Sequence, residues 1–342
     1  MTASPTAAIE TVAIETIDLA KRYGDTVALA GLTMRVERGE VFGFLGPNGA
    51  GKTTAVKLLL GLARASGGRG TVLGAPLGDR EARRRVGYLP ELFRYQAWLS
   101  AREVLALHCE LAHLPRSTWA AEIDAGLRLV GLGERAESRV GGFSKGMQQR
   151  LGLAVALLGS PDLVFLDEPT SALDPIGRLD VREIIGRLRD RGTTVFLDSH
   201  LLTEVERVCD RVAIVDRGRV VATGAMDEMT AGHEVHVRAT GIEDAALPTD
   251  PRLGRLETNE SGLVAVGIEP EAVPDLVAAL VAAGLRIHAV EPARRSLEER
   301  FLSIVREAEA GATDVRATEV RTDAGATAAG LGGSAGAGRG AP

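Results

Sequence analysis

Residues 46–54 read GPNGAGKTT, and three glycines, an alanine and a proline in this stretch accompany one lysine and two threonines. Glycine permits backbone conformations and close approaches that a Cβ atom would prevent, so successive N–H groups can point into one concavity. The spacing Gly46-x4-Gly51-Lys52-Thr53 fits a loop that cradles nucleotide phosphates, in which the lysine reaches the β- and γ-phosphates and the threonine hydroxyl binds Mg²⁺. The predicted contact residues are Gly46, Pro47, Asn48, Gly49, Ala50, Gly51, Lys52, Thr53 and Thr54.

The flanks of this loop have the patterns of a strand and a helix. Residues 40–46, EVFGFLG, form an apolar run of strand length, and residues 54–68 have apolar side chains at helical spacing with glycines at the end. The loop is therefore expected at the C-terminal end of a strand, where open α/β sheets bind ligands. This context argues against an ordinary glycine-rich connector.

Two acidic residues follow a second apolar run. Residues 163–175 read LVFLDEPTSALDP, and their first four residues are typical of a central parallel strand. Asp167 and Glu168 should therefore lie at the same sheet edge as the glycine-rich loop. There Asp167 is suited to hold Mg²⁺ through water, and Glu168 is suited to polarise the water that attacks the γ-phosphate. The simpler alternative is a pair of solvated loop acids.

A histidine follows a third apolar run. Residues 193–200 read TTVFLDSH, so His200 should face the same edge, where its side chain can hydrogen-bond the γ-phosphate. A lone histidine is more often structural, and its place after a core strand favours the functional interpretation.

A second candidate anion site lies in residues 141–162, GGFSKGMQQRLGLAVALLGSPD. Ser144 stands where a helix N-cap belongs, before an apolar-periodic helix that we expect to stop at Gly159. The start of such a helix offers a hydroxyl and free N–H groups to an anion. One nucleotide has no evident need for two such sites from one chain.

Composition sets the outer limits. The chain has 342 residues and a formal net charge of −6, which gives no overall attraction to nucleic acid, and no nucleic-acid partner is expected. Cys109 and Cys209 lie far apart and in no CxxC pairing, so we expect reduced, buried cysteines. No apolar run reaches the about 18 residues of a membrane-spanning helix, and no signal peptide is recognisable.

The composition divides the chain into four parts. Residues 1–13 are expected to be an N-terminal tail. Residues 14–226 alternate strand and helix patterns, which predicts a mostly parallel sheet covered by helices. Residues 227–308 restart with short strands and amphipathic helices, which predicts a small accessory α+β domain. In it His233, His236 and His288 are too dispersed for a metal site. Residues 309–342 have too few large apolar side chains to fold and are expected to be disordered.

Because the motifs described above follow one another in a fixed order along the chain, residues 14–226 resemble the nucleotide-binding subunit of an ATP-binding cassette (ABC) transporter. The glycine-rich loop alone is widespread, but its combination with the helix at Ser144 and the LDEP, SALD and SH segments is specific. The resemblance implies an α/β P-loop NTPase fold with a parallel core sheet, an antiparallel β part and a helical subdomain. It also implies an ATPase with ATP and Mg²⁺ as cofactors.

The resemblance explains the second anion site. In such proteins two subunits, identical or paired, join head to tail, and each closes over the ATP that its partner holds. Ser144 and Gly146 would then contact the partner's γ-phosphate, and Asp174 would lie in the loop that crosses the interface. Tyr23 matches the aromatic residue that stacks on adenine, with an ordinary half-buried strand tyrosine as the alternative.

Two departures from the family pattern stand out. The segment of residues 143–147, here called the signature, reads FSKGM instead of LSGGQ and keeps the serine and the second glycine. Glu91 replaces the usual glutamine at a position that touches both Mg²⁺ and the membrane partner. The segments YLPE and SKGMQQR resemble the ABC-2 type, mostly exporters, which implies a separate membrane permease and a peripheral location at the cytoplasmic face of the membrane.

Alternatives remain open at this stage. Phe93, Tyr95 and Trp98 are either part of a groove that receives a permease helix or part of a local core. The leading rival function is a soluble ABC ATPase that acts as a switch on ribosomes or DNA, although no second cassette or long insertion is visible. A P-loop kinase is a weaker rival, since it gives no reason for the signature or the SALD segment.

Overall fold

The computed structural model describes residues 11–171, 173–231, 234–242, 245–259, 262–293 and 296–308. Among these residues, a six-stranded sheet in the order β10-β9-β3-β8-β7-β6 forms the centre of the ATPase part. The strands β6, β7, β8, β3 and β9 run parallel, and β10 pairs antiparallel with β9 at one edge. Their bounds are β3 Val41–Leu45, β6 Val86–Leu89, β7 Leu163–Asp167, β8 Thr194–Asp198, β9 Arg211–Asp216 and β10 Arg219–Ala225.

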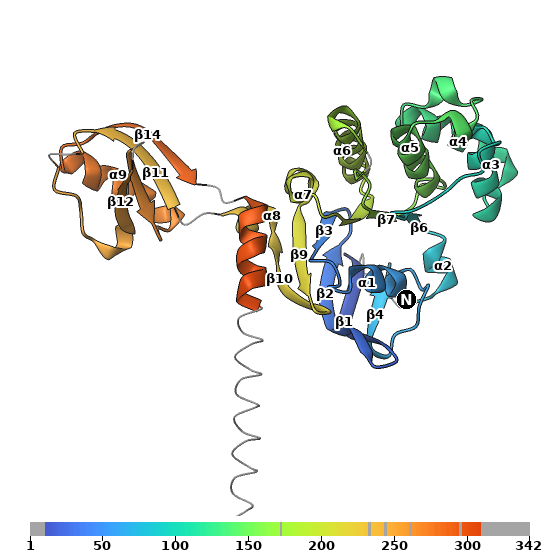
Figure 1. Cartoon of the computed structure of the whole chain (residues 1–342), viewed down its shortest axis with the longest axis horizontal. Coiled ribbons are helices and arrows are strands. Elements are labelled where there is room, and N and C mark those ends of the chain that lie inside the picture. Colours follow the sequence, from blue (N-terminus) through green and yellow to red (C-terminus); the bar gives the residue numbers. More distant parts are fainter. Residues whose placement is uncertain are drawn as a thin grey trace, which may run out of the picture.

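One face of this sheet packs against an antiparallel sheet in the order β2-β1-β4-β5, with α1 between them (Figure 1). Four phenylalanines dominate the largest buried side chains, and the Phe196 ring centroid lies 5.1 Å from that of Phe44 and 5.0 Å from that of Phe165. The first strand begins two residues before the predicted position 14. The bounds are β1 Val12–Tyr23, β2 Thr26–Glu37, β4 Gly67–Val72, β5 Ala75–Pro76 and α1 Lys52–Leu59.

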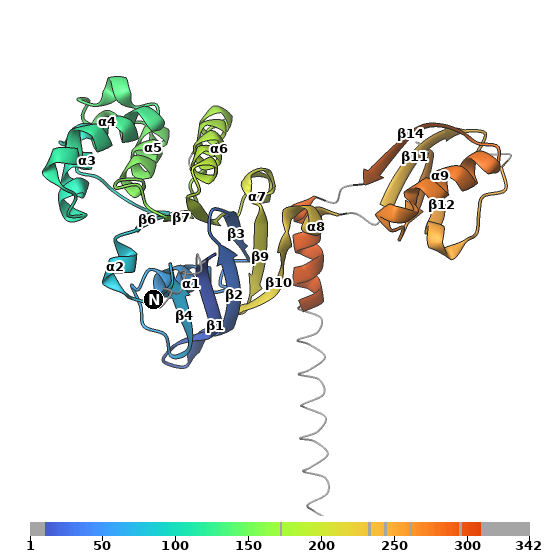
Figure 2. The same cartoon turned by 180° about the vertical axis from the view of Figure 1, so that it is seen from behind.

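The other face carries helices and a helical subdomain, which Figures 1 and 2 show beside β6 and β7. The first helix of the subdomain begins with a capping box, because Ser100 and Glu103 each accept a hydrogen bond from the other's backbone N–H. The helices are α2 Arg80–Arg83, α3 Ala101–Leu111, α4 Trp119–Leu129, α5 Lys145–Ala156, α6 Pro175–Asp190, α7 Leu202–Val208 and α8 Met226–Thr230.

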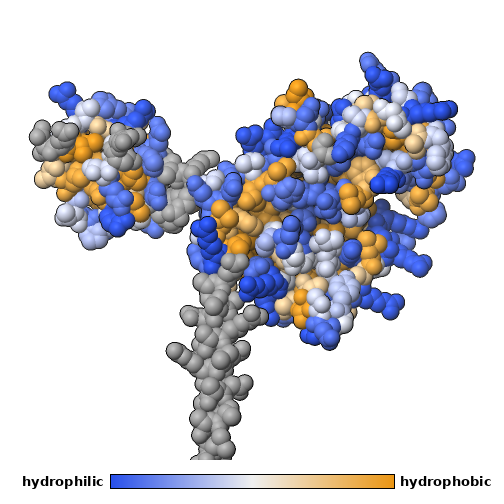
Figure 3. Space-filling model, viewed as in Figure 1, coloured by the Kyte–Doolittle hydropathy of each residue, from blue (hydrophilic) through white to orange (hydrophobic). Residues whose placement is uncertain are grey.

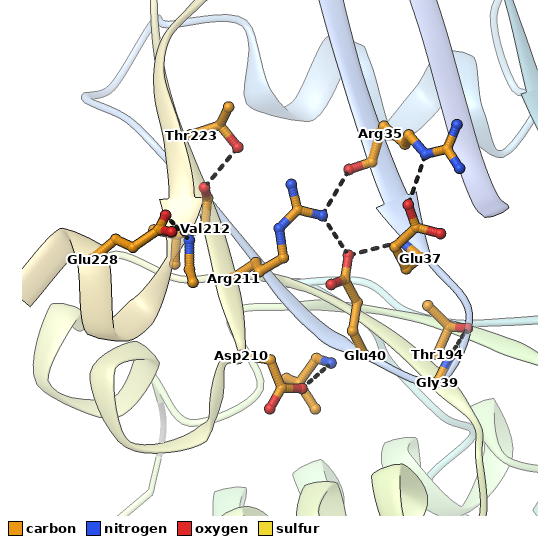
Figure 4. Close-up of polar contacts among 12 residues, drawn as sticks. Arg35, Glu37, Gly39, Glu40, Thr194, Asp210, Arg211, Val212, Thr223 and Glu228 are labelled. Carbon is orange, nitrogen blue, oxygen red and sulfur yellow. Dashed lines mark hydrogen bonds and ion pairs between the residues drawn. The ribbon is translucent and has the colours of Figure 1, made fainter. Parts of the chain in front are cut away.

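A polar network fastens the starts of the parallel strands (Figure 4). Arg211 of β9 contacts the Glu40 carboxylate at 3.3 Å, and the Glu40 carboxylate also accepts the backbone N–H of Glu37. The Asp210 carboxylate accepts the backbone N–H of Val41 at 2.8 Å. Burial raises the pKa of Glu40 above its ordinary value, while Arg211 lowers it. The network therefore lies at the edge opposite the predicted nucleotide loop and serves the fold.

A third sheet, in the order β12-β13-β11-β14, has its own core with α9, separate from the clusters around the central sheet. Leu276 and Leu280 of α9 are fully buried against it. The helix ends before Gly284, whose φ of 89° suits glycine at that position. The bounds are β11 Glu234–Thr240, β12 Arg255–Asn259, β13 Gly262–Val266, α9 Val273–Ala282 and β14 Arg286–Ala293.

Residues 297–308 are helical and pack on the ATPase part, beside α8 and β10 in both views (Figures 1 and 2). The helix begins with a capping box, since Ser296 and Glu299 exchange side-chain and backbone hydrogen bonds. On the outer surface apolar side chains gather along this helix and the neighbouring strand (Figure 3), where Leu302 and Val221 are 44% and 37% exposed. The last helix of the segment predicted as an accessory domain, residues 227–308, thus packs on the ATPase part.

The predicted fold class is confirmed, with parallel core, antiparallel part and helical subdomain all present. Both cysteines are buried and free. Across the described residues, no helix has the length and apolar content needed to span a bilayer. The proposed tail of residues 309–342, most of the N-terminal tail, and His233 lie outside the described residues.

Candidate functional site

The glycine-rich loop joins β3 to α1 in the predicted place. Gly49 and Gly51 have φ angles of 84° and 101°, which disfavour residues with a Cβ. Added Cβ atoms would also overlap the Val215 carbonyl oxygen at Gly46 and the Ala28 carbonyl oxygen at Gly51. The loop is thus shaped by close backbone packing, with Ala50 buried beneath it and Asn48 and Thr53 exposed.

Lys52 is the first residue of α1 and lies over the loop. Its Nζ atom donates to the Gly46 carbonyl oxygen at 2.8 Å and lies 3.5 Å from the Pro47 carbonyl oxygen. The ammonium is therefore held at the loop itself, where a triphosphate would lie in the P-loop pattern. Thr54 follows on the same helix and is half-buried.

The predicted carboxylates and the histidine come from neighbouring strands. Asp167 ends β7, and Glu168 follows it with a φ of 52°, a strained conformation for a residue with a side chain. The Glu168 Oε1 atom accepts the His200 backbone N–H at 2.9 Å and lies 2.7 Å from His200 Nδ1. Glu168 Oε2 is buried and has no hydrogen-bond partner among the described residues. The structure therefore brings Glu168 and His200 together as a pair.

Asp198 is a further acidic residue at this edge, and the sequence interpretation assigned it no role. It ends β8 beside β7 and β3, and its side chain is 4% exposed. Burial, with the carboxylates of Asp167, Glu168 and Glu91, raises the pKa of Asp198 to about 7, although Lys52 lowers it. The signal was present in TTVFLDSH, since Asp198 ends an apolar run as Asp167 does.

The same cluster perturbs two other groups. Burial raises the pKa of Asp167, and the carboxylates of Glu91 and Glu168 raise it further, whereas the Glu91 backbone and Lys52 lower it. Burial and the nearby carboxylates raise the pKa of Tyr88, at the end of β6, to about 12. Excess negative charge at partly buried oxygens is the environment that a divalent cation or its substrate phosphates would neutralise.

The oxygen donors at this edge suit Mg²⁺ with phosphate. Thr53 offers a hydroxyl, and Asp167 and Glu91 offer carboxylates, which are the hard oxygen ligands that Mg²⁺ prefers. No group of three or more His, Cys, Asp or Glu residues within the described part of the chain could hold a metal alone. This fits a Mg²⁺ that takes one or two carboxylates and completes its shell with phosphates and water.

Tyr23 is the last residue of β1, at the hairpin tip that precedes β2. It is 49% exposed, and the Lys21 Nζ atom lies 4.7 Å from its ring centroid. Because β2 passes the glycine-rich loop at Ala28, this hairpin lies near the loop. The tyrosine is not a core residue and has a ring face available for stacking.

The three aromatic residues considered for a permease groove, all in the loop after β6, differ in their burial. Phe93 and Tyr95 pack on the helical-side core with ring centroids 5.3 Å apart, and burial raises the pKa of Tyr95 above its ordinary value. Trp98 is 70% exposed and Leu92 is 86% exposed. Phe93 and Tyr95 therefore belong to the local core, and Trp98 remains a surface residue.

Ser144 caps α5 as predicted. Its Oγ accepts the Met147 backbone N–H at 3.2 Å, and Ser144 and Lys145 are exposed while Gly146 is half-buried. No hydrogen bond among the described residues joins Ser144 or Gly146 to the glycine-rich loop of the same chain. Asp174 likewise caps α6, whose first residue is Pro175, by accepting the Gly177 backbone N–H at 2.7 Å.

A phosphate-cradling loop beside clustered carboxylates, at the C-terminal edge of a parallel sheet, defines a P-loop nucleoside triphosphatase. The family model described as ABC transporter matches residues 29–171. An uncharacterized ABC transporter ATP-binding protein of Synechocystis sp. is 42% identical over 313 residues, which are 87% of this chain and 86% of the relative. The chain belongs to the ABC transporter ATP-binding proteins and is an ATPase of that family.

Two further comparisons agree. The daunorubicin resistance ATP-binding protein of Streptomyces coeruleorubidus is 39% identical over 294 residues, covering 83% of this chain and 93% of the relative. The solved structure of an ATP-binding subunit of an ABC transporter has a TM-score of 0.58 and 32% identity, and it covers 63% of this chain and 91% of that chain. Members of this family bind ATP and power transport.

Proposed function

We propose that this chain powers export through a separate membrane permease, as a peripheral subunit at the cytoplasmic face of the membrane. The direction is supported by the names of relatives, which include a Nod factor export protein 38% identical over 73% of this chain. The YLPE and SKGMQQR segments support it as well. The substrate that is exported is set by the permease.

We further propose that two such subunits pair head to tail with ATP between them. The observation that carries this proposal is the exposed start of α5 at Ser144, which makes no hydrogen bond to the loop of its own chain among the described residues. A capped helix start with free N–H groups is a site for an anion. A second subunit supplies that anion as the γ-phosphate of its own bound ATP.

The chemistry is hydrolysis of the bond between the β- and γ-phosphates. The oxygen of a water molecule bonds to the γ-phosphorus as the bond to the bridging oxygen of ADP breaks, and Glu168 takes the proton of the water. Lys52 and the backbone N–H groups of residues 48–54 stabilise the negative charge on the phosphate oxygens. Tyr23 stacks on the adenine.

The Glu168–His200 pair adds a condition. His200 occupies one oxygen of Glu168, and the other oxygen is buried, so neither is open to a water molecule in this arrangement. Hydrolysis therefore requires a rearrangement that frees an oxygen of Glu168. We assign this step to the closing of the two subunits over ATP, during which the His200 ring turns away from Glu168 and toward the γ-phosphate.

Mg²⁺ is proposed to be held by Thr53, Asp167 and Glu91 together with the phosphates. When bound, it supplies a positive charge that neutralises the β- and γ-phosphate oxygens. The role of this chain is to keep these three side chains in place for Mg²⁺. The Asp167 carboxylate is kept at the end of β7, and the backbone of Glu91 lies close enough to lower its pKa.

The permease is proposed to dock beside the loop that follows β6. The exposed Leu92 and Trp98 lie on this loop. A cavity of about 340 Å³ opens between α2 and α3, and its lining includes Arg83, Tyr88 and His108. The loop thus joins a Mg²⁺ ligand, Glu91, to an apolar surface that another protein can cover.

The variant Glu168→Gln tests two proposals together: that Glu168 is the general base, and that two subunits join head to tail. Glutamine keeps the shape and cannot accept the proton, so ATP hydrolysis should fall roughly 10²- to 10⁴-fold while ATP still binds. Slow hydrolysis should trap the closed pair, which analytical ultracentrifugation detects as a dimer with ATP and Mg²⁺ and as a monomer with ADP. The exposed Glu134→Gln is the matched control and should leave hydrolysis unchanged.

Adding Ser144→Arg to Glu168→Gln should abolish the trapped dimer while ATP binding remains. Ser117→Arg, on the exposed surface of the helical subdomain, should leave the dimer intact. A Glu168→Gln chain that stays monomeric with ATP and Mg²⁺ contradicts the head-to-tail pair. Purification from membranes tests the partner, because ribosomes or DNA in place of a polytopic membrane protein would favour a soluble switch.

A further inference from the structure

The helix of residues 297–308 is bonded to α7. The backbone N–H of Leu297, in its first turn, donates to Glu206 Oε2 at 3.0 Å, across 91 positions of sequence. The Ser296–Glu299 box satisfies the neighbouring backbone groups. A charged acceptor at a free N–H of a helix start also interacts favourably with the helix dipole, so Glu206 fixes where this helix begins.

Apolar contacts complete the junction. Leu297 is fully buried and Ile304 is 6% exposed, and both belong to the core cluster that contains Val205 and Cys209 at α7. Phe301 and Val305 pack against the same cluster. The helix is therefore a part of the ATPase core that comes from the far end of the chain.

α7 begins two residues after the proposed catalytic histidine. His200 lies two residues before Leu202, the first residue of α7, and contacts Glu168 there. α7 has seven residues, and Leu201 at its N-cap provides no side-chain hydrogen bond. So short a helix has little stability of its own, and its position depends on tertiary contacts.

Two carboxylates of α7 supply its polar contacts. Glu204 is 9% exposed and lies 3.3 Å from Arg182 of α6, and Glu206 bonds the final helix. The first contact ties α7 to the helix that Asp174 caps. The second ties it to the element that follows the small domain in sequence.

We propose that residues 297–308 position the hydrolytic centre. Through the Glu206 hydrogen bond and the packing of Phe301 against the cluster that contains Val205, this helix holds α7 in place. His200 is thereby kept at the sheet edge beside Glu168, from which its ring can turn toward the γ-phosphate. Glu206 and Phe301 are positioning residues, and the inference rests on the proposed roles of Glu168 and His200.

The test uses the full-length chain and the variant Glu206→Leu. We expect kcat to fall by about tenfold, within the range known for misplaced groups, with KM and ATP affinity unchanged. Glu206→Gln keeps an acceptor oxygen for the Leu297 N–H and should stay within about threefold of the unaltered chain. Glu298→Leu makes the same change at an exposed position of the final helix and should have no effect.

A double variant separates positioning from general destabilisation. If Glu206 acts through His200, Glu206→Leu should cost nothing further in a His200→Ala chain. Additive losses would overturn the proposal, as would unchanged kcat in Glu206→Leu. Full turnover in His200→Ala alone would instead refute the role assigned to His200, and with it the proposal that the final helix positions this residue. If Glu206→Leu does not fold, Phe301→Ala takes its place with the same expected outcomes.

Discussion

The buried Asp198 gives the chain a stability that depends on pH, and Asp198→Asn should remove that dependence. Its pKa of about 7 lies about three pH units above the ordinary value of an aspartate, because burial and neighbouring carboxylates disfavour the ionised form. A carboxyl whose pKa is raised on folding stabilises the fold below its unfolded pKa, and that contribution is lost as the pH rises through about 7. The nucleotide-free chain should therefore lose stability between about pH 4 and pH 7.

The size of the effect follows from the same numbers. Above pH 7 the ionised Asp198 should lower the free energy of unfolding by about 4 kcal/mol, since one pH unit corresponds to about 1.4 kcal/mol. Asparagine has nearly the same shape and no charge. The variant should thus be more stable than the unaltered chain by up to about 4 kcal/mol at pH 8, and by under about 2 kcal/mol at pH 5.

Urea unfolding at the two pH values, without nucleotide or Mg²⁺, measures this difference. Asp25→Asn, at the exposed hairpin tip, is the control and should show no pH-dependent gain. A gain of the same size at both pH values, or a loss at pH 8, would refute the reasoning. Either result would mean that the charge of Asp198 is satisfied in the fold.

The remaining predictions concern the nucleotide and the end of the chain. Lys52→Ala should nearly abolish ATP turnover with the fold intact, because it removes the cation that the loop holds for the β/γ-phosphates; normal hydrolysis would show that the loop is not the active site. Tyr23→Ala should weaken ATP and GTP binding alike by about 1–3 kcal/mol, and a titration without change would assign the tyrosine no stacking role. Deleting residues 309–342 should leave the melting temperature and ATPase activity unchanged, and a clear fall in the melting temperature would mean that this segment packs on the fold.

Much of the fold was predictable because its signals are local. The strand, loop and helix around residues 46–54, the Ser144 and Asp174 caps and the Ser296–Glu299 box each depend on neighbours within a few positions. The elements that carry the candidate site residues were predicted with them. The roles of those residues stay predictions.

Other features could not be predicted because they depend on distant parts of the chain. The raised pKa of Asp198 arises from carboxylates on different strands, which no single segment contains. Glu168 has a φ of 52° at a position where its backbone N–H donates to the carbonyl oxygen of Asp198, on another strand, at 2.9 Å. The hydrogen bond from Leu297 to Glu206 joins the start of the final helix to α7, 91 positions earlier, and no local sequence pattern predicts this contact.

The proposed hydrolytic centre therefore has two physical connections to the rest of the chain. On one side the Glu91 backbone influences the Asp167 carboxyl, and the same loop continues to the exposed Leu92 and Trp98. On the other side α7 runs from His200 to the final helix at Glu206. The contacts of Glu168 with His200 must break before Glu168 can act as the proposed base. We therefore propose that a signal at either connection sets when ATP is hydrolysed. Docking of a permease would act through the first connection, and movement of the final helix through the second.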